Sequence, residues 1–185
     1  MPLPTATERQ SAHTRNISCR GYRRTDGLWD IDGHLVDTRD ETMQTFGRGR
    51  IEPGEALHEM WMRLTVDDEL RVVDLQASIE RAPYPACPYF PRERFEKLIG
   101  QVIAPGWTAR VRLALGGPHG CTHLVELLGP LATTAVQTVY AWRGESIDST
   151  HHQPPEEFIN SCHSLAEDGE AARRLWPGHK HDEPA

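Results

Sequence analysis

The densest group of reactive side chains in the sequence is the segment 119–123, HGCTH, which Glu126 follows one helical turn later. Gly-Gly-Pro precedes the segment and an apolar run follows it, so we expect a helix to begin here. The dipole and the free N–H groups of a helix N-terminus favour the thiolate of Cys121, which suits metal binding or nucleophilic attack. His123 and Glu126 would then share one face of the helix. The alternative is that Cys121 is a small buried apolar residue, His123 a helix cap and Glu126 a solvated acid.

Two further candidate metal ligands lie outside this segment. Cys87 stands in the Pro-rich turn PYPACPYFP, and His58 precedes a predicted strand in GEALHEM. Structural zinc takes four N or S ligands, commonly in two pairs, and the sequence contains no CxxC pair. Ligands from separate elements would therefore have to converge through the fold, and a mixed set of Cys and His suits zinc or iron. We predict that the metal ligands are His58, Cys87, Cys121 and His123, with His119 or Cys162 as substitutes.

A row of acid and base candidates follows the first predicted strand. Asp30, Asp32, His34 and Asp37 alternate along it, and the first three of them share one face. Such a row could serve proton transfer. The alternative is a solvent-facing strand surface that has no chemical role.

The first half of the chain has the patterns of strands. Apolar and polar residues alternate over 29–35 and again over 60–66, which is the period of a half-buried strand. The acidic turn 67–69 joins the second of these to a strand at 70–79, so the two form a hairpin. Residues 39–56 are rich in Arg, Gly, Glu and Thr, and we expect them to form a long surface loop.

The second half has the patterns of helices. Apolar residues are spaced for one stripe over 95–102, and we expect further helices at 107–115, 121–142 and 155–165, with a kink at Gly-Pro 129–130 in the helix over 121–142. Strands therefore precede helices. This order predicts an α+β fold, with an antiparallel sheet from the N-terminal half covered by helices from the C-terminal half.

Length and charge limit the class of protein. A chain of 185 residues closes one core without needing a metal or a disulfide, and we expect a single α+β domain at 15–176 between disordered tails at 1–14 and 177–185. A formal net charge of −7 argues against nucleic acid as a partner. The sequence shows no apolar run of about 20 residues and no signal peptide, so we expect a cytoplasmic protein with no membrane contact and reduced thiols. The oligomeric state stays open.

Four blocks of the sequence carry a resemblance to a known family: RGYRRTDGLWDIDGHLVDT, LHEMWMRLTVDDELRVVD, GWTARVRLALGGPHGCTHLVELLGPLATTAVQT and the late CHSL. On these blocks the chain is identified as a member of a bacterial domain-of-unknown-function family, number 2889, over about residues 13–176. The resemblance implies that the blocks belong to one domain. It implies no function.

A second resemblance begins at Leu64. The order of elements is similar to that of NifU-type iron–sulfur scaffold proteins, with LTVDDELRVVD as the hairpin, Cys87 as the middle cysteine and His119 with Cys121 as the late pair. The family's first ligand cysteine would be replaced here by His58. With that replacement, the resemblance implies a zinc or mononuclear metal site rather than iron–sulfur assembly.

Three functions are compatible with these residues. The first is a Cys/His metal site for zinc or iron that acts on a small molecule, with Glu126 or Asp74 as base. The second is a metal-free thiol enzyme for a small acyl or keto substrate, with Cys121 as nucleophile and His123 or His119 as base. The third is a binding or assembly module that uses the Trp-bearing strands and the loop 39–56 to contact a protein partner.

Overall fold

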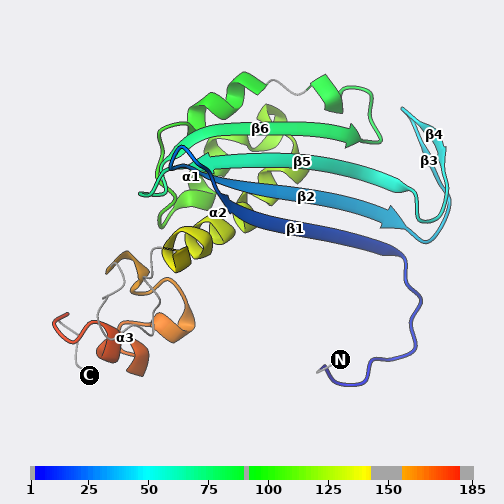
Figure 1. The fold of residues 1–185 in the computed structure, drawn as a ribbon. Coiled ribbons are helices and arrows are strands. Elements are labelled where there is room, and N and C mark those ends of the chain that lie inside the picture. Colours follow the sequence, from blue (N-terminus) through cyan, green and yellow to red (C-terminus); the bar gives the residue numbers. More distant parts are fainter. Residues whose placement is uncertain (1–2, 90–91, 143–155, 180–185) are drawn as a thin grey trace.

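The computed structural model describes residues 3–89, 92–142 and 156–179. Four long strands form one sheet in the order β1 (His13–Arg23), β2 (Trp29–Arg39), β5 (Ala56–Val66) and β6 (Val72–Arg81). All neighbouring pairs are antiparallel, as Figure 1 shows. The predicted hairpin between β5 and β6 is confirmed, and its turn is held by the Asp67 carboxylate, which accepts the N–H groups of Glu69 and Arg71.

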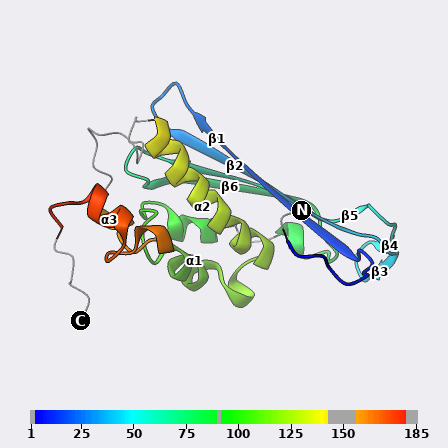
Figure 2. The ribbon, with the colours of Figure 1, turned by 90° about the horizontal axis from the view of Figure 1, so that it is seen from below.

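The helices α1 (Trp107–Leu115) and α2 (Thr122–Trp142) lie on one side of the sheet (Figure 2). This arrangement confirms the predicted α+β fold. Helix α2 comes close to the strands where two of them carry glycine: a Cβ at Gly21 would lie 2.0 Å from the Thr138 hydroxyl, and one at Gly33 would lie 3.0 Å from Leu131. No helix in the described part of the chain is long and apolar enough to cross a membrane.

The predicted alternation in β2 and β5 is also confirmed. In β2 every second residue from Trp29 onward is buried against the helices, and in β5 the buried positions include Met60, Met62 and Leu64. Leu127, Leu128 and Leu131 of α2, along with other helix residues, close the core over these side chains. The sheet therefore has one apolar face, which is covered, and one polar face.

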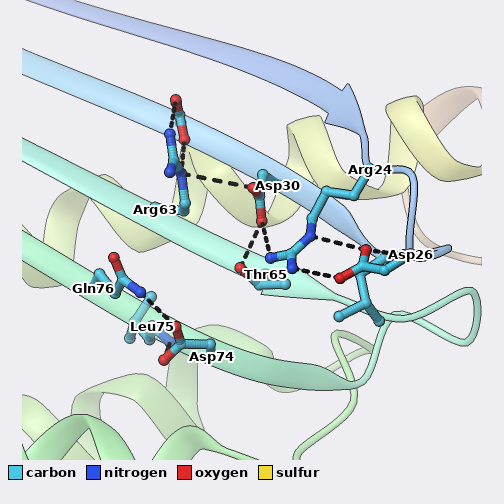
Figure 3. Close-up of polar contacts among 10 residues, drawn as sticks. Arg24, Asp26, Asp30, Arg63, Thr65, Asp74, Leu75 and Gln76 are labelled. Carbon is cyan, nitrogen blue, oxygen red and sulfur yellow. Dashed lines mark hydrogen bonds and ion pairs between the residues drawn. The ribbon is translucent and has the colours of Figure 1, made fainter.

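The polar face carries the acidic row of the first predicted strand. Arg63 pairs with Asp32 at 2.6 Å, and Asp30 accepts a hydrogen bond from Thr65 at 2.7 Å (Figure 3). His34 stacks on Trp61 with ring centroids 3.6 Å apart. These side chains form a network of ion pairs and hydrogen bonds on the face opposite the helices, which favours a structural surface over a proton-transfer row.

Residues 39–56 are more ordered than a long loop. They contain a small two-stranded sheet of β3 (Met43–Thr45) and β4 (Gly49–Ile51). The tip of this hairpin packs against the Pro-rich segment, because the Gly47 N–H donates to the Pro83 carbonyl at 3.1 Å. The turn between β3 and β4 is therefore hydrogen-bonded to the Pro-rich segment that follows β6.

The predicted helix over 95–102 is wrong in its extent. The chain forms a 3₁₀ helix, η2 (Arg92–Leu98), which ends before Gly100 with its φ of 80°. Residues 100–103 instead pair with residues 70–72, at and just before the start of β6: the Gly100 N–H donates to the Val72 carbonyl, and the Ile103 N–H donates to the Leu70 carbonyl. Strand-like pairing has replaced the last helical turn.

The predicted helix over 155–165 is also wrong where the structure describes it. That stretch contains two single 3₁₀ turns, η4 (Glu156–Phe158) and η5 (His163–Leu165), and a short helix α3 (Glu170–Leu175) follows. Asn160 lies between the two turns with φ 61°, and its side chain accepts the Glu167 N–H. This left-handed residue interrupts any continuous helix.

The predicted tails, 1–14 and 177–185, can be compared with the structure only in part. Strand β1 begins at His13, inside the segment predicted as the N-terminal tail. Of the C-terminal tail, residues 180–185 lie outside the described residues, as does the start of the last predicted helix. Two more short elements complete the described part of the chain, the 3₁₀ turns η1 (Cys87–Tyr89) and η3 (Gly117–His119).

Candidate metal centre

Three potential metal ligands meet at one end of the sheet. Asp37, His58 and His123 each offer a donor atom, and these atoms all lie within 4.8 Å of one another. Asp37 lies near the end of β2, and His58 is its cross-strand neighbour on β5. This end of β2 adjoins the small hairpin of β3 and β4 in Figure 1. His123 lies in the first turn of α2. Two rigid strands and one helix therefore fix the group.

The alternation of β2 explains why Asp37 is buried. It continues the series of positions that begins at Trp29 and faces the helices, and only 1% of its surface is exposed. A buried carboxylate is costly unless it is paired. Arg15, directly opposite on β1, supplies the pair, with Nε to Oδ1 and Nη2 to Oδ2 both at 2.7 Å.

Two imidazoles approach the same carboxylate oxygen. His58 Nδ1 lies 3.0 Å and His123 Nε2 lies 3.7 Å from Asp37 Oδ2. The two rings lie against each other with centroids 3.9 Å apart. Donors bound to zinc at about 2.0–2.1 Å in a tetrahedron are about 3.3 Å apart, so small side-chain adjustments would bring these three around one ion.

The protonation states suit metal binding. Burial would raise the pKa of Asp37, but the adjacent Arg15 guanidinium outweighs burial and holds that pKa below its ordinary value. Burial lowers the pKa of His58, and His123 lowers it further. Burial and Arg15 together lower the pKa of His123. At neutral pH the site therefore offers a carboxylate and two neutral imidazoles, the forms that bind metal ions.

Two cysteines lie at the edge of this group. Cys121 Sγ is 3.9 Å from His123 Nδ1, the ring nitrogen opposite the one that approaches Asp37. Burial raises the pKa of the Cys87 thiol, and the nearby Cys121 raises it further. Both thiols therefore border the centre without belonging to the group of three donors around the carboxylate.

The remaining predicted site residues lie outside the group of three donors. Glu126 lies on an exposed part of α2 and accepts a hydrogen bond from Arg15 Nη1. His119 and Cys162 are exposed in short turns outside the group of three donors. Asp74 pairs in register with Thr65, and its carboxylate accepts from Gln76 on the polar face (Figure 3). Asp74 is therefore not placed to act as a base at this centre.

Two residues of the centre were not among the predicted ligands. Asp37 was considered only as one of the strand acids. It follows Trp29 by an even number of residues, and this spacing places it on the buried face of β2. Arg15 of β1 was not among the candidate residues at all. A third histidine, His13, also reaches Asp37, with Nε2 3.4 Å from Oδ1, although the sequence placed it in a tail.

Comparison with known proteins gives a family and no function. A sequence model described as "Protein of unknown function (DUF2889)" matches residues 13–137, which is more than half of the chain. No curated protein and no solved structure matches the chain. The match covers every residue of the Asp37 centre, and the similarity to NifU-type proteins stays a prediction.

Proposed function

The chain belongs to the DUF2889 family of proteins of unknown function, and we propose that it binds one zinc or iron ion through Asp37, His58 and His123. The observation that carries this proposal is the convergence of three donor atoms from β2, β5 and α2 within 4.8 Å. Two imidazoles and one carboxylate form the ligand set of hydrolytic zinc sites and of non-haem iron sites.

The number of ligands favours a reactive ion over a structural one. Structural zinc sites are closed by four protein ligands, whereas three leave a position open for water or substrate. An ion bound there would polarise a carbonyl group or lower the pKa of a bound water molecule. We therefore propose metal-assisted chemistry on a small molecule as the activity of this centre.

The residues around the three ligands have positioning roles in this proposal. Arg15 holds both oxygens of Asp37 and so fixes the direction of the carboxylate. Cys121, at 3.9 Å from His123 Nδ1, is the neighbour that would orient this ring while Nε2 binds the ion. Such contacts to a ligand's second atom tune metal affinity. Glu126, exposed on α2 and hydrogen-bonded to Arg15, is the candidate for accepting a proton.

Elemental analysis of untagged protein, purified without chelator, tests the metal site. We expect about one zinc or iron ion per chain, and loss of the ion in His58→Ala and His123→Ala. The matched control is His34→Ala, which removes an imidazole from β2 on the polar face and should keep the ion. Circular dichroism verifies that each variant is folded. Full metal content in a folded double variant of His58 and His123 would refute the proposal, as would an empty protein after reconstitution with zinc and with anaerobic iron.

A second candidate function follows from a different contact in the same cluster. Cys121 Sγ, His123 and Asp37 Oδ2 form a chain with steps of 3.9 Å and 3.7 Å, the order of groups in a thiol enzyme. The lowered pKa of His123 weakens this alternative, because it disfavours an imidazolium that would stabilise the thiolate.

Alkylation with iodoacetamide at pH 7, after chelator treatment, separates the two candidates. The exposed Cys162 serves as an internal reference for an ordinary thiol. If the protein is a thiol enzyme, Cys121 should react much faster than Cys162. The metal proposal predicts that the partly buried Cys121 reacts no faster than this reference.

A further inference from the structure

Arg15 uses its two edges in different ways. Nε and Nη2 bind the carboxylate of Asp37, whose side chain is 1% exposed. Nη1 donates to Glu126, whose side chain is 45% exposed and lies on the surface of α2. One edge of the guanidinium is therefore part of the buried structure, while the other edge meets a carboxylate at the surface.

The buried contact fixes the direction of the exposed edge. A guanidinium is planar, and a bidentate pair with a carboxylate sets its orientation. The Nη1 edge is thus held in place before any ligand arrives, which reduces the entropy lost on binding. Nη1 and the Glu126 carboxylate form an ion pair at the surface. Such pairs are weak, so a competing anion can replace the carboxylate.

The guanidinium adjoins the proposed metal position through its Asp37 edge, and Glu126, which Nη1 contacts, lies one helical turn after the ligand His123 on α2. Asp37 Oδ2 lies 2.7 Å from Arg15 Nη2 and 3.0 Å from His58 Nδ1, so the guanidinium and the first imidazole share one oxygen. A divalent ion bound by neutral imidazoles and a single carboxylate keeps a net positive charge, and Arg15 adds another. A negatively charged ligand would offset this charge, whereas a neutral ligand would not.

We propose that the substrate of this centre carries a carboxylate, which binds the Nη1 edge of Arg15 beside the metal ion. In the free protein the side chain of Glu126 occupies the position of that carboxylate. The inference rests on the proposed metal site and specifies its substrate class, a small carboxylic acid. Arg15 acts in it as a binding residue and Glu126 as a competitor.

Titration of the cobalt-substituted protein tests the inference. Cobalt(II) replaces zinc or iron and reports ligand binding through its visible absorption. Acetate is the probe, and acetamide is its neutral counterpart. We expect acetate, and not acetamide, to change the absorption. We also expect Glu126→Gln to bind acetate about threefold more tightly than the wild type, because the substitution weakens the exposed ion pair that competes with acetate.

Glu59→Gln provides the matched control. It removes one negative charge from a half-buried pair with His34 on the polar face, so its acetate affinity should equal that of the wild type. Equal affinities in Glu126→Gln and wild type, or equal responses to acetate and acetamide, would overturn the carboxylate inference while leaving the metal site intact. Absence of a cobalt spectrum would overturn the metal site itself, so the two failures are distinguishable.

Discussion

Arg15 and Asp37 face each other across β1 and β2 and are joined by two hydrogen bonds of 2.7 Å each. Asp37 is nearly the last position on the buried side of β2, where the other side chains are apolar or glycine. The pair therefore supplies the positive charge that neutralises this buried carboxylate, to which His58 adds a hydrogen bond. It also keeps that carboxylate oriented toward His58 and His123.

Removing Arg15 should destabilise the protein. In Arg15→Ala the buried Asp37 loses its main partner, and we expect the free energy of unfolding to fall by about 2–3 kcal/mol, less than for a fully buried pair because water reaches this one. Urea denaturation measures the change. The matched control is Arg63→Ala, whose pair with Asp32 lies on the polar face and should contribute less than about 1 kcal/mol. Equal losses in both variants would contradict the assigned role of Arg15.

The close approach of α2 to β1 leads to a second prediction. At Gly21 an added Cβ would lie 2.0 Å from Thr138 Oγ1 and 2.8 Å from its Cβ, so rotation of the threonine cannot relieve the overlap. We expect Gly21→Ala to lower stability by about 1–3 kcal/mol, the usual cost of overpacking. Arg20→Ala changes the adjacent, exposed residue and should stay within about 0.5 kcal/mol of wild type. Thermal unfolding of the two variants gives the comparison.

The parts of this structure that could be predicted are those with a local cause. Alternation over 29–35 identified the buried face of β2, because successive residues of a strand point to opposite sides. Helix α1 has the predicted bounds 107–115, because it is flanked by Pro105 and by the pair Gly116 and Gly117. Each of these signals lies within a few residues of the element that it defines.

The full centre could not be predicted because it depends on register. Arg15 meets Asp37 only because β1 and β2 pair without a shift along their length, and a slip of one residue would turn Arg15 to the other face. His58 reaches Asp37 just where β2 and β5 change register, at a bulge that no composition pattern indicates. His58 and His123 were predicted as ligands from their residue types, whereas Asp37 required knowledge of the pairing.

Metal binding should raise the thermal stability of the protein. An ion that binds only the folded state stabilises it by about 2.7 kcal/mol at 100 times its Kd, or about 5–10 °C in Tm for a chain of this size. We expect this shift on adding zinc to wild type and to His34→Ala, and no shift in His58→Ala. Chelator should reverse the increase. A similar increase in His58→Ala would indicate that zinc binds elsewhere.

Cys121 provides the last prediction, because its Sγ lies beside His123 Nδ1 while Nε2 of the same ring faces Asp37. If the thiol orients His123 as a ligand, Cys121→Ser should weaken zinc affinity by about 10–100-fold, the usual effect of losing such a partner. Competition with a chromophoric chelator measures the affinity. Cys162→Ser replaces an exposed cysteine in the C-terminal segment and should leave the affinity unchanged. Wild-type affinity in Cys121→Ser would show that the carboxylate and the two imidazoles bind the ion without help from this thiol.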